Sequence, residues 1–393
     1  MRVYTLHDAQ EYLKRKKNGA LVIDGQEAAS VEAALPLETL RGGQFILLHA
    51  RAQNNQEALR LCYAGVRFYC GGELLINRSL VKQGTEPPDA YLGYVQFHGD
   101  GMRIYDLRWI VPFGVDRAEI IFTVRNGAKL TFDELTVEVV DMISPQESGK
   151  GGIKLVSHLG ITGYAPKNTM PAFRLACRAR YRECVTNTNH TSDGHLVTLH
   201  DNTIDATSNG QGAIREMTLA QARRYDYGSY AHPIYAGCEI PELADVLELM
   251  ARSRVRPVLR LGDFVGESEK YLADIYRLCE HTGHIGCMTA KAFSGEVLEA
   301  FALIAGDSAR YGLCTREITE EKARWLKKLG KDVYFDVRHT HVTDEMLETA
   351  HEYDIPIESW IVNEYDKIIA LHRKGVSGFT TDFFPMDGCF LDE

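Results

Sequence analysis

The chain of 393 residues is long enough for two domains, or for one barrel of about 250 residues with an addition. Its 45% hydrophobic and 25% charged residues exclude a fibrous or largely disordered protein. The net charge of -10 excludes a general basic surface for nucleic acid or anionic membranes, so an anionic substrate must be bound by a local cluster of cations.

No segment has the hydropathy of a membrane span or a secretion signal. Apolar runs stay well short of about 18 residues, and the start MRVYTLHDAQ lacks the apolar core of a signal peptide. The nine cysteines are scattered, with no CxxC pair and no Cys/His cluster at zinc spacing. Free thiols in a reducing compartment explain this better than a disulfide framework, so we expect a cytoplasmic protein.

Residues 1–148 are expected to form a β-sandwich domain, with a helix near residues 6–17. Apolar runs separated by Gly, Asn, Asp and Pro predict its strands. These runs are QFILLHARA, GVRFYCGGELLIN, YLGYVQFH, MRIYDLRWIVPF, AEIIFTVRNG and KLTFDELTVEVV. The sequence Arg125-Asn126-Gly127 predicts a hairpin turn between the last two.

The polar, Gly-rich segment PQESGKGG at residues 145–152 predicts a short linker, so a second domain covers residues 149–393. Apolar runs then alternate with segments of helical period, which predicts a (β/α)8 TIM barrel. The runs are KLVSH, YRECVTN, HLVTLH, RPVLRLG, GCMTAK, RYGLCT, DVYFDVR, PIESWIV and GFTTDF. The helical segments are MPAFRLACRAR, LADVLELMARS, ESEKYLADIYRLCEHT, SGEVLEAFALIAG, TEEKARWLKKLG, TDEMLETAHEY and NEYDKIIALHRKG.

Segments of the second domain resemble motifs of the glycerophosphodiester phosphodiesterase family, in the same order. SHLGITGYAPKNTMPAF resembles the family's HRGxxGxxPENTxxAF, and RYRECVTNTNHTSDGHLVTLHD resembles GIELDVxxTKDGxxVxxHD. DNTIDATSNGQGAIREMTLAQARRYDYGS, IPELADVLELM, ESWIVN and GVSGFTTDFFP follow further family motifs. The resemblance extends over residues 153–387 and implies a barrel of that family's type.

The end of the first domain is similar to a second kind of module. WIVPFGVDRAEIIFTVRNGAKLTFDELTVEV resembles the closing strands of jelly-roll carbohydrate-binding modules. This resemblance implies sugar binding, whereas Tyr and Trp in sandwiches more often pack in the core. Sugar binding and a packing or dimerisation role, with a homo-oligomer as its result, both stay open.

The phosphodiesterase resemblance implies that His158 and His200 are catalytic. Each follows an apolar run, and the active sites of barrels lie at the C-terminal ends of the strands, so both are expected at one cavity. In the family these histidines act as acid and base. One imidazole removes a proton from the attacking hydroxyl and the other protonates the leaving alkoxide.

The family's metal ligands are replaced in this chain. Where the family motif has the Glu and Asp of ELD, the chain has Val185 and Asn187, and where it has the Glu of LNIELK, the chain has Arg260. Hard divalent cations need several oxygen ligands with negative charge. We therefore expect no metal site and no cofactor. The alternative is a relocated site that uses Asp263 or Asp382.

Arg260 is expected to contact the substrate in place of the cation, because a guanidinium binds phosphate in a bidentate manner. A buried salt bridge from Arg260 to Glu183 or Asp336 is the structural alternative. Further candidate substrate contacts at strand ends are Asn187, Lys291, Trp360 and Asn363.

The leading functional hypothesis is a diverged, metal-independent hydrolase of a small phosphodiester or a related glycosidic substrate. A pseudoenzyme that binds a phosphorylated or sugar ligand without turnover is the first alternative. A purely structural role of the sandwich is the second, and it leaves the two histidines unexplained.

Overall fold

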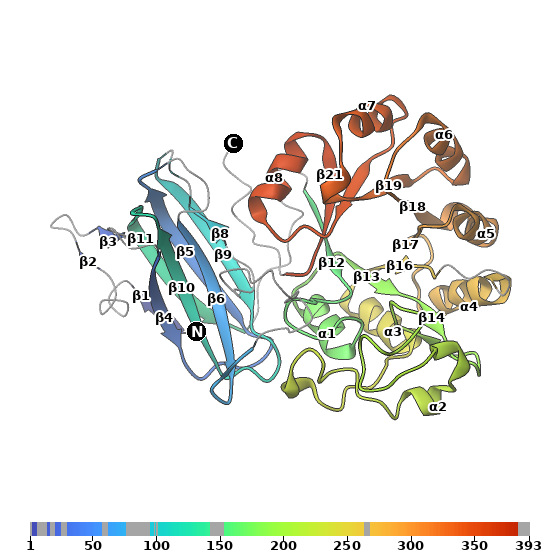
Figure 1. The fold of residues 1–393 in the computed structure, drawn as a ribbon, viewed down its shortest axis with the longest axis horizontal. Coiled ribbons are helices and arrows are strands. Elements are labelled where there is room, and N and C mark those ends of the chain that lie inside the picture. Colours follow the sequence, from blue (N-terminus) through green and yellow to red (C-terminus); the bar gives the residue numbers. More distant parts are fainter. Residues whose placement is uncertain are drawn as a thin grey trace.

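A computed structural model of the chain describes residues 2–5, 14–15, 20–24, 30–56, 62–75, 95–97, 99, 101–141, 153–262 and 268–383. An antiparallel β-sandwich precedes a barrel of parallel strands surrounded by helices (Figure 1). Both predicted folds are therefore confirmed. The predicted linker at 145–152 lies outside the described residues.

The sandwich consists of two antiparallel sheets whose facing apolar residues form its core. The first sheet contains β2 (Lys14–Arg15), β3 (Leu21–Asp24), β11 (Lys129–Val140), β5 (Phe45–Asn54) and β9 (Arg103–Ile110), with β1 (Arg2–Thr5) paired to β11. The second contains β4 (Ser30–Leu37), β10 (Arg117–Arg125), β6 (Cys62–Cys70), β7 (Glu73–Leu74) and β8 (Val95–Gln96). Phe132 of one sheet packs edge-on against Phe122 of the other, with ring centroids 5.2 Å apart.

The hairpin prediction is confirmed, and part of the helix prediction is wrong. Asn126 and Gly127 join β10 to β11 with positive φ values of 49° and 71°, which fit the twist of the two strands. Near the start of the chain, Lys14–Arg15 is strand β2, which pairs with β3. Lys14 and Arg15 are extended and not helical because they pair with the edge of the sheet. The rest of the predicted helix lies outside the described residues.

Eight parallel strands close the barrel. They are β12 (Lys154–His158), β13 (Glu183–Asn187), β16 (Arg256–Arg260), β17 (Met288–Ala292), β18 (Ala309–Thr315), β19 (Val333–Arg338), β20 (Ile357–Trp360) and β21 (Val376–Thr381). The α-helices are α1 (Met170–Arg178), α2 (Leu219–Ala222), α3 (Leu243–Ser253), α4 (Ser268–His281), α5 (Gly295–Ala305), α6 (Glu320–Leu329), α7 (Asp344–Glu352) and α8 (Tyr365–Arg373). Short 3-10 helices are η1 (Ile214–Glu216), η2 (Pro233–Tyr235), η3 (Gly306–Ser308) and η4 (His339–His341).

One of the nine predicted strands does not belong to the barrel. The run HLVTLH contributes only β15 (Leu196–Val197), which pairs with β14 (Asn189–His190) in a separate hairpin. This hairpin lies between β13 and β16 in the chain, as part of a long insertion beside the barrel mouth. His200 therefore follows the hairpin and not a barrel strand.

The sandwich packs against the barrel through buried apolar side chains. Phe68 of β6 meets Tyr164, in the loop after β12, edge to face, with ring centroids 5.5 Å apart. Arg178 at the end of α1 donates from Nε to the carbonyl of Gly43 at 3.0 Å. Buried residues of both parts belong to one continuous apolar cluster. Among the described helices, none has the length and apolar character to cross a membrane.

Candidate active site

The C-terminal ends of the barrel strands place several polar side chains in one layer at the barrel mouth. Asn187 on β13 is in register with Arg260 on β16, and Arg260 with Lys291 on β17. His158 closes β12 and Trp360 closes β20. Because alternate residues of each strand point inward, this layer forms the floor of the mouth.

His158 is held by a chain of hydrogen bonds. Its Nδ1 lies 2.7 Å from Asp382 Oδ1, and Asp382 Oδ2 accepts from Asn363 Nδ2 at 2.8 Å. The Asp382 carboxylate is buried, with 5% of its side chain exposed, while 21% of the His158 side chain is exposed. A carboxylate accepts only, so Nδ1 carries the proton and Nε2 is left for chemistry.

The loop after His158 turns sharply at Gly160, which has a φ of 87°. A Cβ on Gly160 would lie 2.4 Å from the backbone of Ala172 in α1, so only glycine allows this close approach. The loop then carries Asn168 across the mouth, where Asn168 Nδ2 donates to Asn187 Oδ1 at 3.2 Å. Asn187 thereby uses its amide oxygen within the protein.

His200 is held by a different carboxylate, that of Asp201, and two cations lie near it. Its Nδ1 lies 2.7 Å from Asp201 Oδ1, and 47% of its side chain is exposed. Burial lowers the pKa of His200 below its ordinary value of 6.5, Asp201 raises it, and the charges of Lys167 and Arg260 lower it further. His200 is thus biased towards the neutral imidazole, which is the form of a general base.

The positions of the family's metal ligands do not fit a divalent cation. Val185 packs in an apolar cluster with Val156, Leu159 and Val258, and the oxygen of Asn187 is engaged by Asn168. Arg260 adds a positive charge at the same level. Within the described ranges, no group of three or more His, Cys, Asp or Glu side chains is arranged to hold a metal. Asp263 lies outside those ranges, and Asp382 is bound to His158 and Asn363.

Arg260 and Trp360 line the mouth together with an aromatic residue that the sequence did not single out. The guanidinium of Arg260 lies over the ring of Phe293, 5.3 Å from its centroid. Trp360 meets the same ring edge to face at 6.1 Å and donates from Nε1 to the carbonyl of Asp336 at 3.3 Å. Phe293 is 45% exposed, so the three side chains form a wall that solvent reaches.

Lys291 is buried at the side of the mouth. Its Nζ lies 2.8 Å from Asp336 Oδ2, and only 7% of the Lys291 side chain is exposed. Burial works against the charge of Lys291, but the neighbouring Asp336 carboxylate outweighs it and raises the pKa of the ammonium. A substrate could reach this cation only by competing with Asp336.

The two carboxylates considered as partners of Arg260 bind other cations. Asp336 binds Lys291, and Glu183 binds Lys154 at 2.6 Å. Lys154 begins β12 and Glu183 begins β13, so their ion pair lies at the N-terminal end of the barrel, opposite the mouth. The structural alternative of a salt bridge from Arg260 to one of these two residues is therefore wrong, because Glu183 lies at the opposite end of the barrel from Arg260 and Asp336 is bound by Lys291.

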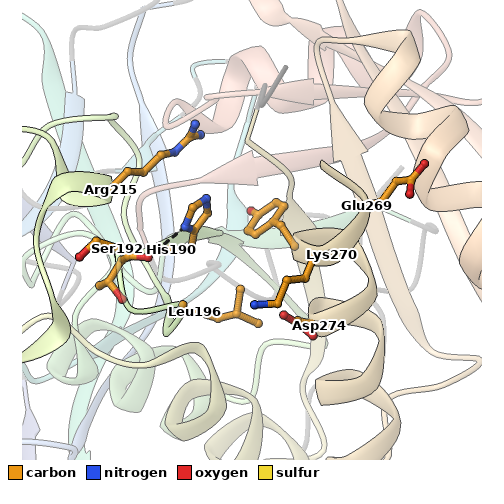
Figure 2. Close-up of a pocket in the computed structure, with 10 residues that line it drawn as sticks. His190, Ser192, Leu196, Arg215, Glu269, Lys270 and Asp274 are labelled. Atoms are coloured by element: carbon orange, nitrogen blue, oxygen red, sulfur yellow. Dashed lines mark hydrogen bonds between the residues drawn. The ribbon is translucent and has the colours of Figure 1, made fainter. Parts of the chain in front are cut away.

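A cavity of about 930 Å³ lies beside the mouth, between the β14–β15 hairpin, η1 and α4. Figure 2 shows Arg215, His190 and Lys270 extending into it from these three elements, while the carboxylate of Glu269 points away. Tyr271 on α4 lines the cavity and contacts Thr188, which donates from Oγ1 to the carbonyl of Arg260 at 3.1 Å. The cavity is therefore next to Arg260.

Comparison with known proteins agrees with this architecture. Residues 158–386, more than half of the chain, match the Glycerophosphoryl diester phosphodiesterase family. A putative glycerophosphodiester phosphodiesterase of Bacillus subtilis is 24% identical over 249 residues, which cover 58% of this chain and 94% of the relative. A glycerophosphodiester phosphodiesterase of Bacillus altitudinis is 24% identical over 232 residues, covering 58% and 94%.

Solved structures share the fold of the barrel. A phosphodiesterase of Oleispira antarctica, in complex with its product sn-glycerol-3-phosphate, superposes with a TM-score of 0.54 at 18% identity and covers 59% of this chain and 93% of its own. A putative glycerophosphoryl diester phosphodiesterase of Silicibacter pomeroyi gives 0.53 at 19% identity, covering 60% and 91%. The sandwich accounts for most of the chain that these similarities leave out.

Proposed function

The chain belongs to the glycerophosphoryl diester phosphodiesterase family, and we propose that it hydrolyses a small phosphodiester by acid-base catalysis of His158 and His200 without a divalent cation. One observation supports this proposal above the others. His158 is fixed by Asp382, which is itself fixed by Asn363, and such a chain orients a ring for proton transfer. A histidine that only packs would not require it.

His200 is the base in this proposal. Its pKa is lowered, so the neutral imidazole is available near pH 7 to take the proton of the attacking hydroxyl or water. His158 is the acid. It gives its Nε2 proton to the leaving alkoxide, and the Asp382 carboxylate supplies the counter-charge to the imidazolium.

Arg260 takes the place of the cation at the phosphate. Its planar guanidinium offers several donors to two phosphoryl oxygens at once, and it lies where the family has a metal-binding carboxylate. Phe293 and Trp360 flank it with apolar rings. The cavity between His190, Arg215 and Lys270 is large enough for the alcohol that leaves.

The experiment is an assay of the full chain on a panel of glycerophosphodiesters, lysophospholipids and sugar phosphodiesters. Glycosides are included to test the alternative substrate class, which has no phosphate. We expect turnover of at least one phosphodiester, reduced by about 10²-fold or more in both H158A and H200A. Turnover that survives both substitutions would refute the acid-base assignment. Melting temperatures of the variants show whether the fold is intact.

A pseudoenzyme remains the second candidate because of a specific feature. Leu159 and Val185 make one side of the mouth apolar, at positions where the family contacts phosphate and metal. Loss of both contacts is expected in a barrel that binds a ligand without cleaving it. Binding of a phosphodiester at the mouth that R260A removes, together with no turnover across the panel, would favour this candidate.

A further inference from the structure

Six arginines surround one cavity at the end of the barrel opposite the mouth. The cavity has a volume of about 720 Å³ and no acidic residue in its lining. The arginines are Arg174, Arg178, Arg180, Arg182, Arg252 and Arg254. Arg182 and Arg254 precede β13 and β16, which locates the cavity at the N-terminal ends of these strands. Such a concentration of cations is unexpected in a chain with a net charge of -10.

Two of the six arginines have partners within the protein. The remaining four leave a large excess of positive charge around the cavity. Arg178 binds backbone carbonyls of Gly43 and Asp141 in the sandwich, and Arg252 pairs with Glu248 at 3.0 Å. The other four form no ion pair with a carboxylate among the residues that the structure describes; they are Arg174, Arg180, Arg182 and Arg254.

The C-terminal ends of α1 and α3 contribute negative potential near the cavity, and this explains part of the cluster. Each helix end corresponds to about half a negative charge. Together the two helix ends balance the positive charge of about one arginine. The charge of the other arginines without a carboxylate partner stays unbalanced.

Backbone geometry provides an independent argument. Both helices end in the same capping pattern, in which the backbone N–H of Arg180 donates to the Cys177 carbonyl at 3.1 Å and the backbone N–H of Arg254 donates to the Ala251 carbonyl at 3.1 Å. These arginines have φ values of 58° and 57°. Glycine is the usual residue at this capping position because a side chain there is strained. Two arginines thus replace the favoured glycine, and both line the same cavity.

We propose that this cavity, the arginine pocket, binds a small molecule that carries two or more phosphate groups. Guanidinium groups bind phosphate oxygens in a bidentate manner, and four arginines match the charge of an oligophosphate better than that of a single phosphate. The volume suits a small ligand. Phe113 of the sandwich also lines the pocket, so the ligand bridges the sandwich and the barrel.

The test is calorimetric titration of the full chain with tripolyphosphate at about 150 mM salt, where weak surface attraction is screened. We expect saturable binding of one ligand per chain. The variant R180G/R254G should bind at least about tenfold more weakly, because each lost charged hydrogen bond is worth about that factor. Its melting temperature without ligand should be unchanged or higher, because glycine relieves the strain at both positions.

Two controls make the result specific. R324Q/K328Q removes the same charge from exposed positions of α6 and should bind like the wild type, within about twofold. R260A removes the cation at the mouth, so any binding that this variant loses is assigned to the mouth and not to the arginine pocket. The proposal is wrong if tripolyphosphate does not bind, if R180G/R254G binds like R324Q/K328Q, or if R260A is the variant that loses binding. It is also wrong if the two glycine substitutions abolish binding only to vesicles of anionic phospholipid.

Discussion

His158 and His200 are each held by a neighbouring carboxylate, but water reaches the two carboxylates to very different extents. Asp382 is 5% exposed and has a second partner in Asn363, whereas Asp201 is 39% exposed. A buried carboxylate with two hydrogen-bond partners fixes a ring more firmly than an exposed carboxylate with one. The orientation of His158 should therefore depend on its partner more than that of His200 does.

We predict that D382N lowers kcat by about 10²-fold or more, with little change in KM, because the His158 ring loses its fixed tautomer and orientation. D201N is the matched control and should cost less than about tenfold. Steady-state kinetics on the first phosphodiester found to turn over would measure both. Equal losses in the two variants would contradict the difference in burial.

The pH profile should report the cationic surrounding of His200. The pKa of His200 is lowered, so the imidazole stays neutral below pH 6.5. The midpoint of the acid limb of kcat/KM should therefore lie below pH 6.5. K167Q should move this limb to higher pH, because Lys167 is one cause of the lowered pKa. K328Q, on the distant α6, should leave the limb in place. An acid limb above pH 6.5 in the wild type would contradict the assignment of His200 as base.

At the scale of elements, the N-terminal ends of the barrel strands are joined by buried ion pairs. Glu358 on β20 accepts from Lys154 on β12 at 2.9 Å and from Arg310 on β18 at 2.5 Å. Glu358 is 6% exposed on its side chain. Burial works against its charge, but Lys154 and Arg310 outweigh this and hold the pKa of Glu358 below its usual 4.5.

We predict that E358Q lowers the free energy of unfolding at pH 7 by about 2 kcal/mol, because two partly buried cations lose a shared carboxylate while each keeps a second one, Glu183 or Asp332. A carboxyl whose pKa is lowered by folding stabilises above its unfolded pKa and loses that contribution as pH falls through its folded pKa. The difference between wild type and E358Q should therefore shrink below pH 4.5. Urea unfolding at several pH values measures it, with E348Q on the exposed face of α7 as control. A difference that stays constant down to pH 3 would contradict this account.

Most elements were predictable because their apolar period is long and regular. Eight of the nine runs predicted as strands after residue 149 belong to the barrel, but HLVTLH has the same pattern and pairs with β14 instead. Pattern alone cannot decide which strand a short apolar run will join. Strand β4 was missed for a different reason, since Pro36 is atypical of a strand interior although the buried positions of β4 alternate regularly.

Within the site, the histidines were predictable from local motifs and their partners were not. His158 and Asp382 are 224 positions apart, and Lys291 and Asp336 are 45 apart. Only the closed barrel brings such residues together. Phe293 lies in a loop after β17. Nothing in the local sequence indicates that its exposed ring contacts Arg260. The roles of Asn187, Trp360, Asn363 and Lys291 towards a substrate stay predictions.

At the scale of the whole molecule, the sandwich and the barrel share buried apolar surface. Phe68, Tyr164 and Phe45 belong to one cluster, and Tyr164 is 1% exposed. The linker predicted from the sequence implies that residues 1 to about 145 fold alone. The shared surface adds that each fragment should be less stable than the same part within the full chain.

We predict a single unfolding transition for the full chain, because separation of the two parts would expose Phe68 and Tyr164 to water. Trp109 lies in the sandwich, and Trp325 and Trp360 lie in the barrel. Fluorescence of W325F/W360F and of W109F should give the same urea midpoint. Two separate midpoints, or fragments as stable as the full chain, would show that the parts are independent.

We propose that this barrel cleaves phosphodiesters without a divalent cation, so the response of its activity to metals is the decisive property. The measurement is the rate of phosphodiester hydrolysis by the full chain after exhaustive treatment with EDTA, then after addition of Mg²⁺, Ca²⁺ or Mn²⁺. We predict equal rates in all samples, because Val185, Asn187 and Arg260 offer no carboxylate to offset the dehydration of a cation. Activity that EDTA abolishes and a metal restores would contradict it.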